Sequence, residues 1–347
     1  MKEKRVTSFD VAKAAGVSRS VVSAVINGTP GIGVSQETRE KVLRAIEELH
    51  YHVDAGARAM KTGVSRCIAA FGNMHNPLFL QVMEGMQKAC AERGYQILIS
   101  GKSSEDTDRY ELLDLYRQRS IDGIITLDAT SYGDAQWLEA IKLVRVPYIS
   151  IEGYADTAGV TSILMNYRKS MTDALRFMRR SAGAKPIYIE AYLEGASTNW
   201  AERDRKDAYA NWCKEHGELP EFYTMEAYDE AWAMRFLQKR LSVEEPLPPI
   251  LINWSVSAVY LYRAAWRLGL TVGRDVLLMA GDDTNRGNAQ MAPALSSVQV
   301  PYSLMGEAAV RELFDQMERS TRYKTKKLWL EGSIFPGESA ILSKRDG

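Results

Sequence analysis

The stretch VAKAAGVSRSVVSAVING, residues 11–28, contains two short helical patterns separated by one glycine, Gly16. Apolar residues recur at helical spacing on both sides of this glycine, and Ser18 can cap the second helix. A helix–turn–helix of this kind exposes the start of its second helix, which can then enter a DNA major groove. An ordinary three-helix subdomain fits the same pattern equally well.

The second helix is predicted to have an inward and an outward face. Its inward residues are Val22, Val25 and Ile26. Its outward residues are Arg19, Ser20, Ser23, Ala24 and Asn27. A third helical pattern begins after Ser35, where Val42, Ile46 and Leu49 repeat at helical spacing. The first 50 residues are therefore predicted to form a small all-α head.

From Cys67 onward, short apolar runs such as CIAAFG and PYISIEG alternate with amphipathic helical stretches. The predicted helices span 79–93, 106–119, 167–180, 201–216, 229–241 and 256–268. Such alternation predicts parallel sheets that are covered on both faces. The runs are too many for one sheet, so two α/β lobes are expected, the second starting near Ser162. The last run, KKLWLEGSIF, is predicted to cross back between them.

Composition narrows the class of protein. The 347 residues carry 44 basic and 44 acidic side chains, so the overall charge favours no polyanionic partner. Residues 1–61 hold ten Lys/Arg against seven Asp/Glu, a surplus of three that alone carries little weight. No window is long and apolar enough for a membrane helix, and the first ten residues lack the apolar stretch of a secretory signal. Three widely spaced cysteines fit a reducing cytoplasm and predict neither disulfides nor a metal site.

The segment VTSFDVAKAAGVSRSVVSAVING, followed by VSQETREKVLRAIEELHYHVDAGARAMKTG, resembles the N-terminal module of LacI-family transcriptional repressors. The family pattern there is V-T-x-x-D-V-A-x-x-A-G-V-S-x-x-T-V-S-R-x-L-N-G, then V-S-x-x-T-R-x-x-V-x-x-A-x-x-x-L-x-Y. The match is dense over residues 6–63 and continues more loosely through NPLFLQVMEGMQKACAERGYQILIS, IDGIITL and VLLMAGDDT to SSVQVPYSLMG.

The resemblance implies a multidomain fold. A small all-α helix–turn–helix head (1–50) and a hinge helix (51–63) precede an α/β core (64–347) of two doubly wound parallel-sheet lobes, similar to type I periplasmic binding proteins. We expect lobe 1 to comprise about 64–161 and 296–325. We expect lobe 2 to comprise about 162–295 and 326–347.

The resemblance also implies a function. Family members bind pseudo-palindromic, double-stranded operator DNA as homodimers, and a small-molecule effector between the lobes, often a sugar or sugar derivative, changes that binding. We therefore expect a cytoplasmic repressor that is not an enzyme, needs no cofactor and contacts no membrane. Two alternatives remain: a solute-binding protein of transport or sensing without DNA function, or a regulator that responds to a nucleoside or another metabolite.

The predicted DNA contacts are Ser18, Arg19, Ser20, Val21, Ser23, Ala24, Asn27, Arg58 and Met60. Arg19 and Ser20 are expected to be the principal readers, since they begin the second helix. Ala24 stands where the family has arginine, and its methyl group cannot make an arginine's paired hydrogen bonds to guanine. Met60 replaces the leucine that the family wedges into the minor groove. The alternative for Arg19 is a contact with phosphate only.

The predicted effector contacts are Phe79, Arg205, Trp254 and Asp282. Arg205 and Asp282 match ligand-contacting positions of the family, and such a pair can grip hydroxyls or a carboxylate. The two aromatic residues could stack on sugar faces, or simply pack between the lobes. The chain departs from the family pattern in the core, because Trp254-Ser255 replaces an Asn-Asp pair and Asn166 replaces an aspartate.

Overall fold

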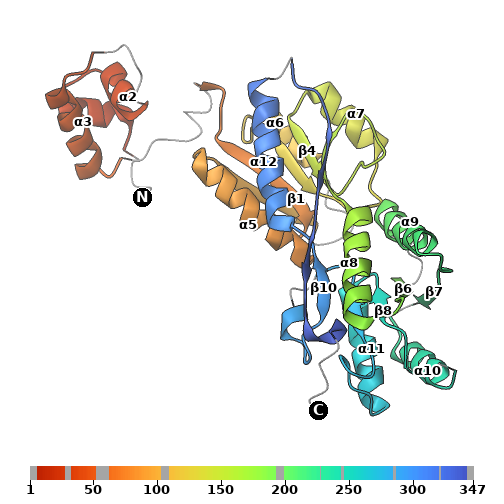
Figure 1. Cartoon of the computed structure of the whole chain (residues 1–347). Coiled ribbons are helices and arrows are strands. Elements are labelled where there is room, and N and C mark those ends of the chain that lie inside the picture. Colours follow the sequence, from red (N-terminus) through yellow and green to blue (C-terminus); the bar gives the residue numbers. More distant parts are fainter. Residues whose placement is uncertain are drawn as a thin grey trace. The chain divides into compact units, whose positions relative to one another are not determined.

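The computed structural model describes residues 6–27, 33–51, 62–102, 109–192, 199–226, 228–243, 246–283, 287–319 and 322–341. The chain divides into two compact units, Met1–Ser65 and Arg66–Gly347 (Figure 1). We expected the division after residue 63, close to the observed position. Among the described residues, no helix is both long and apolar enough to cross a membrane.

The N-terminal unit contains helices α1 (Ser8–Ala15), α2 (Arg19–Asn27) and α3 (Gln36–Glu48). Gly16 ends α1 in the left-handed conformation, with φ 67°, which a glycine adopts without strain. Ser35 caps α3, since its side chain accepts a hydrogen bond from the Thr38 backbone nitrogen at 3.2 Å. A small apolar core holds the three helices together; it consists of Val11, Ala12, Val22, Val25, Val42 and Ala45.

Lobe 1 of the second unit is built on a sheet with the strand order β11-β5-β4-β3-β1-β2, six strands among the described residues. These strands are β1 (Cys67–Asn73), β2 (Gln96–Lys102), β3 (Ile124–Leu127), β4 (Tyr148–Ile151), β5 (Thr161–Met165) and β11 (Lys327–Leu330). Neighbouring strands pair in parallel. The helices of this lobe are α5 (Pro77–Glu92), α6 (Glu111–Arg117), α7 (Ala135–Val144) and α12 (Tyr302–Glu318).

Lobe 2 has a sheet with the order β12-β10-β9-β8-β6-β7 among the described residues. Its strands are β6 (Ile187–Tyr192), β7 (Phe222–Glu226), β8 (Ile250–Ile252), β9 (Leu278–Ala280), β10 (Ser296–Gln299) and β12 (Ser333–Phe335). Among the described strand pairs of this sheet, β10–β12 is antiparallel and the other four are parallel. The helices are α8 (Tyr167–Ala182), α9 (Trp200–Glu215), α10 (Glu230–Leu241) and α11 (Ser255–Arg267), and short 3₁₀ turns lie at Asn288–Gln290 and Glu338–Ala340.

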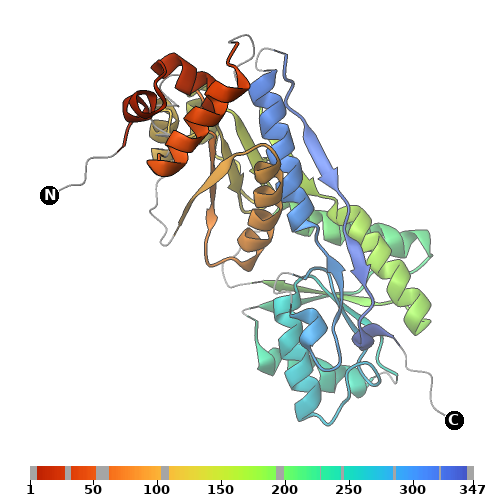
Figure 2. The ribbon, with the colours of Figure 1, turned by 90° about the vertical axis from the view of Figure 1, so that its left-hand side faces the viewer.

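The two-lobed fold class is confirmed, but three strands lie in the other lobe from the one we expected. β5 and β11 belong to the lobe 1 sheet, although we assigned residues from 162 and from 326 to lobe 2. β10 belongs to the lobe 2 sheet, although we assigned residues from 296 to lobe 1. The chain therefore crosses between the lobes directly after β5, after β10 and between β11 and β12. Figure 2 shows the last crossing in blue, with β11 running down beside α12.

Helices α5 and α12 pack unusually closely on one face of the lobe 1 sheet (Figure 2). Gly85 of α5 faces the Ser303 carbonyl oxygen, and Gly306 of α12 faces the Val82 carbonyl oxygen, so that a Cβ atom at either glycine would overlap the opposite backbone. These two glycines allow the backbones of the two helices to approach closely.

Candidate functional site

The first turn of α2 presents polar side chains to solvent. Ser18, Arg19 and Ser20 are all exposed. The Ser18 hydroxyl accepts a hydrogen bond from the Val21 backbone nitrogen at 3.4 Å and lies 2.7 Å from the Ser20 hydroxyl. Ser18 thus caps the helix, as predicted, and it leaves Arg19 as the long side chain that can reach outward from this turn.

The rest of α2 differs from the prediction at one position. Val21 and Ser23 are half-buried, but Ala24, which we expected to face outward, is only 4% exposed. A single methyl group does not extend beyond the side chains around it, so Ala24 packs within the head and offers no surface to a base. Asn27 is the last residue of α2. Arg58 and Met60 lie outside the described residues.

The core buries Arg205 of α9 against two aromatic rings. Its guanidinium carbon lies 4.1 Å from the ring centroid of Tyr167 and 4.1 Å from that of Trp254. The residue is 1% exposed, so it does not lie on a solvated helix face. Neither Nη1 nor Nη2 has a hydrogen-bond partner among the described residues. Both aromatic faces contribute cation–π attraction, but the N–H edge is left without an acceptor.

A buried carboxyl group lies near this cation. Glu152 follows β4 in the left-handed conformation, with φ 68°, and is 3% exposed. Its Oε1 accepts a hydrogen bond from the Tyr167 hydroxyl at 3.0 Å, while its Oε2 has no partner among the described residues. Burial raises the pKa of Glu152 to about 7, although the Tyr167 hydrogen bond and the positive charge of Arg205 oppose the shift. At neutral pH this carboxyl is therefore partly protonated.

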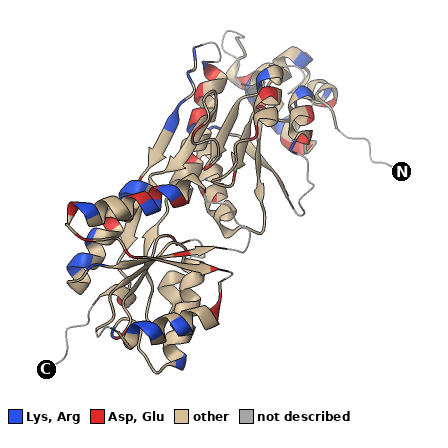
Figure 3. Cartoon of the chain, turned by 90° about the vertical axis from the view of Figure 1, so that its right-hand side faces the viewer, with Lys and Arg blue, Asp and Glu red and all other residues tan. Residues whose placement is uncertain are grey.

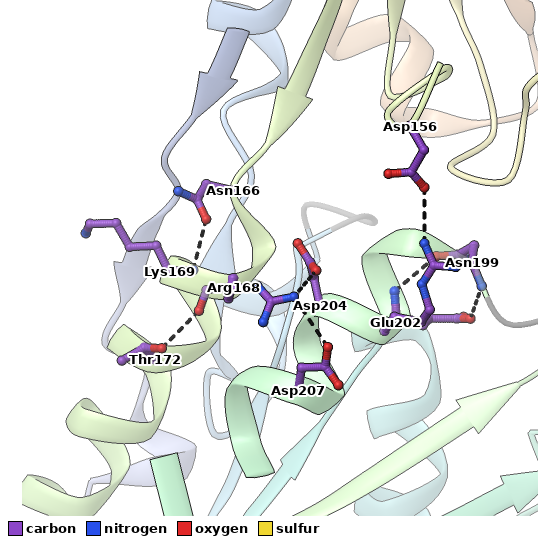
Figure 4. A network of polar contacts seen from close by, with 10 residues as sticks. Asp156, Asn166, Arg168, Lys169, Thr172, Asn199, Glu202, Asp204 and Asp207 are labelled. Carbon is purple, nitrogen blue, oxygen red and sulfur yellow. Dashed lines mark hydrogen bonds and ion pairs between the residues drawn. The ribbon is translucent and has the colours of Figure 1, made fainter. Parts of the chain in front are cut away.

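The start of α9 is tied to the segment that follows β4. The Trp200 indole nitrogen donates to the Glu152 carbonyl oxygen at 3.2 Å, and Arg203 pairs with Asp156 at 3.2 Å. Figure 4 shows Asp156 reaching from lobe 1 toward α9, whose first turn is closed by the reciprocal hydrogen bonds of Asn199 and Glu202. The helix that carries Arg205 in lobe 2 is thus held directly against lobe 1.

The other two lobe 2 candidates have structural partners. Asp282 is 1% exposed, and its Oδ1 accepts a hydrogen bond from the Ser255 backbone nitrogen at 2.5 Å, at the start of α11. Trp254 is half-buried and directs its ring at Arg205. One carboxylate oxygen of Asp282 and one face of Trp254 are therefore already engaged by the protein.

Phe79 lies where sequence reasoning did not expect it. It is the third residue of α5, it is 2% exposed, and its ring packs against Gly72 of β1, where a Cβ atom would come within 2.6 Å of Cδ2. We expected Phe79 to offer a stacking face to an effector. The aromatic side chain instead belongs to the apolar core under the helix, and it also forms part of the wall of a groove between α5 and β2.

Sequence reasoning missed two residues of this site, Glu152 and Tyr167. Glu152 ends the apolar run PYISIE. Acidic side chains are rarely buried unless they are paired, so an acid beside a buried strand could have been recognised as a candidate site residue. Tyr167 follows Asn166 at the start of α8 and gave no signal in the sequence, since a tyrosine there also fits simple packing.

Three sequence models of known families match the chain. Residues 9–54 match the bacterial regulatory proteins of the lacI family. Residues 69–232 match the periplasmic binding proteins and sugar-binding domain of the LacI family, and residues 181–340 match a periplasmic binding protein-like domain. The chain belongs to the LacI family. The head model matches first along the chain, followed by the two core models.

Similar proteins of known function are transcriptional regulators. The chain is 26% identical to the HTH-type transcriptional repressor PurR of Klebsiella pneumoniae (strain 342), over 90% of each chain. It is 26% identical to catabolite control protein A of Priestia megaterium, over 91% of this chain and 94% of the relative. A crystal structure of the lac repressor dimer bound to operator and the anti-inducer ONPF superposes with a TM-score of 0.76 at 21% identity, over 97% of this chain and all of that one.

These matches indicate a transcriptional regulator. LacI-family members are regulators of transcription and not enzymes, as the sequence predicted. The alternative of a solute-binding protein without DNA function is not favoured, because a helix–turn–helix head is part of the match.

Proposed function

We propose that this LacI-family chain is a sequence-specific transcriptional repressor whose affinity for operator DNA is changed by a small molecule bound between the two lobes of its core. The buried Arg205 side chain carries the proposal. A buried charge whose N–H groups lack partners is costly, and a bound ligand can supply the missing acceptors. The effector is a sugar or sugar derivative, because the aromatic surface around Arg205 suits a ring that carries polar groups.

The proposed reader is the start of α2. Arg19 contacts a base edge, with Ser20 beside it, because both are exposed in the first turn. Ser18, Val21, Ser23 and Asn27 would contribute supporting contacts. Arg58 and Met60 of the hinge lie outside the described residues and remain predicted DNA contacts, with Met60 wedged between bases in the minor groove.

The chain is proposed to act in the cytoplasm as a homodimer. Lobe 1 carries a groove of about 670 Å³ between α5 and the edge strand β2. Met74, Leu80 and Ile99 line it and are 54%, 68% and 50% exposed. A second copy of the chain would cover this apolar face and bring two heads to the two halves of a pseudo-palindromic site. In the view of Figure 3, the acidic and basic residues of the second unit are interspersed along its helices.

Binding-site selection from random duplexes tests the proposal, followed by anisotropy titrations of the selected duplex at fixed salt. We expect one enriched pseudo-palindrome and a dissociation constant that changes when a member of a panel of sugars, sugar acids and nucleosides is added. Failure to enrich any sequence would overturn the repressor proposal. Enrichment without a response to any panel member would restrict it to DNA binding.

A further inference from the structure

We infer that the effector carries a carboxylate, and that Arg205 binds this group through the free edge of its guanidinium. This inference rests on the proposed function and narrows the effector from sugars and sugar derivatives in general to sugar acids or similar hydroxy acids. It depends on three observations of the described residues: the aromatic rings that contact Arg205, the lack of hydrogen-bond acceptors for its terminal nitrogens, and the lack of a carboxylate paired with it.

The aromatic contacts leave the N–H groups of Arg205 as its means of recognising a ligand. The guanidinium carbon lies 4.1 Å from the ring centroid of Tyr167 and 4.1 Å from that of Trp254. The ring faces offer no acceptor oxygen to Nη1 and Nη2, whose N–H bonds form a planar fork. A carboxylate matches that fork with two oxygens and a negative charge, whereas a hydroxyl offers one uncharged oxygen.

The missing partners make the present arrangement incomplete. Arg205 is 1% exposed, and Nη1 and Nη2 have no hydrogen-bond acceptor among the described residues. By comparison, two other largely buried arginines form ion pairs: Arg109 with Asp128 at 2.9 Å, although its Nη1 also lacks a partner among the described residues, and Arg240 with Glu221 at 2.7 Å. Arg205 differs from both because neither of its terminal nitrogens has a partner among the described residues.

The counter-charges that could neutralise Arg205 are weakened or absent. Where the LacI pattern has an Asn-Asp pair and an aspartate, this chain has Trp254-Ser255 and Asn166. The nearby acids are already engaged: Glu152 by Tyr167, Glu202 by the Asn199 backbone nitrogen, and Asp282 by the Ser255 backbone nitrogen. Burial also raises the pKa of Glu202, and it raises the pKa of Glu152 to about 7, which lowers the negative charge of Glu152 at neutral pH. A bound carboxylate would supply a negative charge beside Arg205.

Matched ligand pairs test the inference on the full chain. Isothermal titration and thermal shift compare glucuronate with glucose, galacturonate with galactose, gluconate with glucitol, and acetate with acetamide. We expect at least one acid to bind about tenfold or more tightly than its neutral partner, equivalent to about 1.4 kcal/mol or more. The advantage should vanish in Arg205→Gln and shrink in Arg205→Lys, which keeps the charge but loses the fork.

Arg203→Gln is the matched control, because Arg203 lies two residues earlier in α9, is exposed and pairs with Asp156. It should keep the preference for acids. If no acid outperforms its neutral partner in the wild type, or if the preference survives in Arg205→Gln, the inference is overturned. Operator selection decides the proposed function separately, so a chain that binds operator and responds to a neutral sugar would contradict only the carboxylate.

Discussion

The guanidinium of Arg205 stacks 4.1 Å from the ring centroid of Trp254, and no described residue accepts a hydrogen bond from its two terminal nitrogens. Such an arrangement is unfavourable for the unliganded protein, because the cation has lost its water without gaining an acceptor. It is favourable for binding, because the guanidinium is already held against two aromatic rings and loses little freedom when a ligand arrives.

Replacing Arg205 by methionine separates stability from ligand binding. The substitution removes a buried cation that lacks a hydrogen-bond partner, so Arg205→Met should leave the free energy of unfolding within about 1 kcal/mol of the wild type, or increase it. Urea unfolding of the unliganded protein measures this. The same variant should lose the stabilisation that an effector produces, about 2.7 kcal/mol at ~100 times its dissociation constant. A loss of more than about 3 kcal/mol without ligand would mean that Arg205 has a structural partner.

Glu152 predicts a pH dependence of stability. Its pKa of about 7 lies above the ordinary 4.5, so between these pH values the folded chain holds a proton that the unfolded chain has released. Its contribution is fully present below pH 4.5 and is lost as the pH rises to about 7, on the order of 3 kcal/mol. The groups facing this carboxyl are Tyr167, Arg205 and Tyr302.

The comparison of wild type with Glu152→Gln isolates this effect, because the amide does not titrate. Urea unfolding at about pH 5 and about pH 8 should show wild-type stability falling relative to the variant as the pH rises. A difference between the two proteins that does not change with pH would show that Glu152 titrates as an ordinary surface acid.

The close contact at Gly306 predicts that adding a methyl group there, which would push α5 and α12 apart, lowers the free energy of unfolding. In Gly306→Ala the new methyl group would overlap the Val82 carbonyl oxygen and lie 3.0 Å from the Met86 backbone nitrogen. The strain should cost about 1–3 kcal/mol and outweigh the gain of up to about 1 kcal/mol that alanine brings to a helix. Thermal unfolding tests this against Gly133→Ala, where the nearest atom is Thr157 Oγ1 at 3.9 Å. Equal midpoints for the two variants would show that the helices can move apart freely.

Much of the fold could be predicted because periodicity reports local structure directly. The runs from CIAAFG to VLLMAG became strands β1 to β9, and the helical stretches between them became helices with ends shifted by a few residues. The lobe membership of β5, β10 and β11 could not be predicted, since an apolar run shows that a strand forms but not which sheet it joins.

The site was predicted less completely, for physical reasons that differ by residue. Arg205 was found through the family pattern, but its burial between Tyr167 and Trp254 depends on packing between α8, α9 and the end of β8. Phe79 was misplaced because an aromatic residue near a strand end fits a stacking role and a core role equally well. Ala24 was assigned to the outer face by helical spacing alone, which does not report how far neighbouring side chains extend over a methyl group.

Binding-site selection with the full-length wild type and Arg19→Ala, at matched salt, tests the central claim most directly, with Arg44→Ala of α3 as a control for the loss of one exposed positive charge. The wild type should enrich one pseudo-palindrome. Arg19→Ala should lose about 1–3 kcal/mol of affinity and relax selectivity at a single symmetric pair of positions. A wild type that enriches no sequence would contradict the repressor account, and a uniform loss in Arg19→Ala, with a salt slope lower by about one, would show that Arg19 touches phosphate and does not read a base.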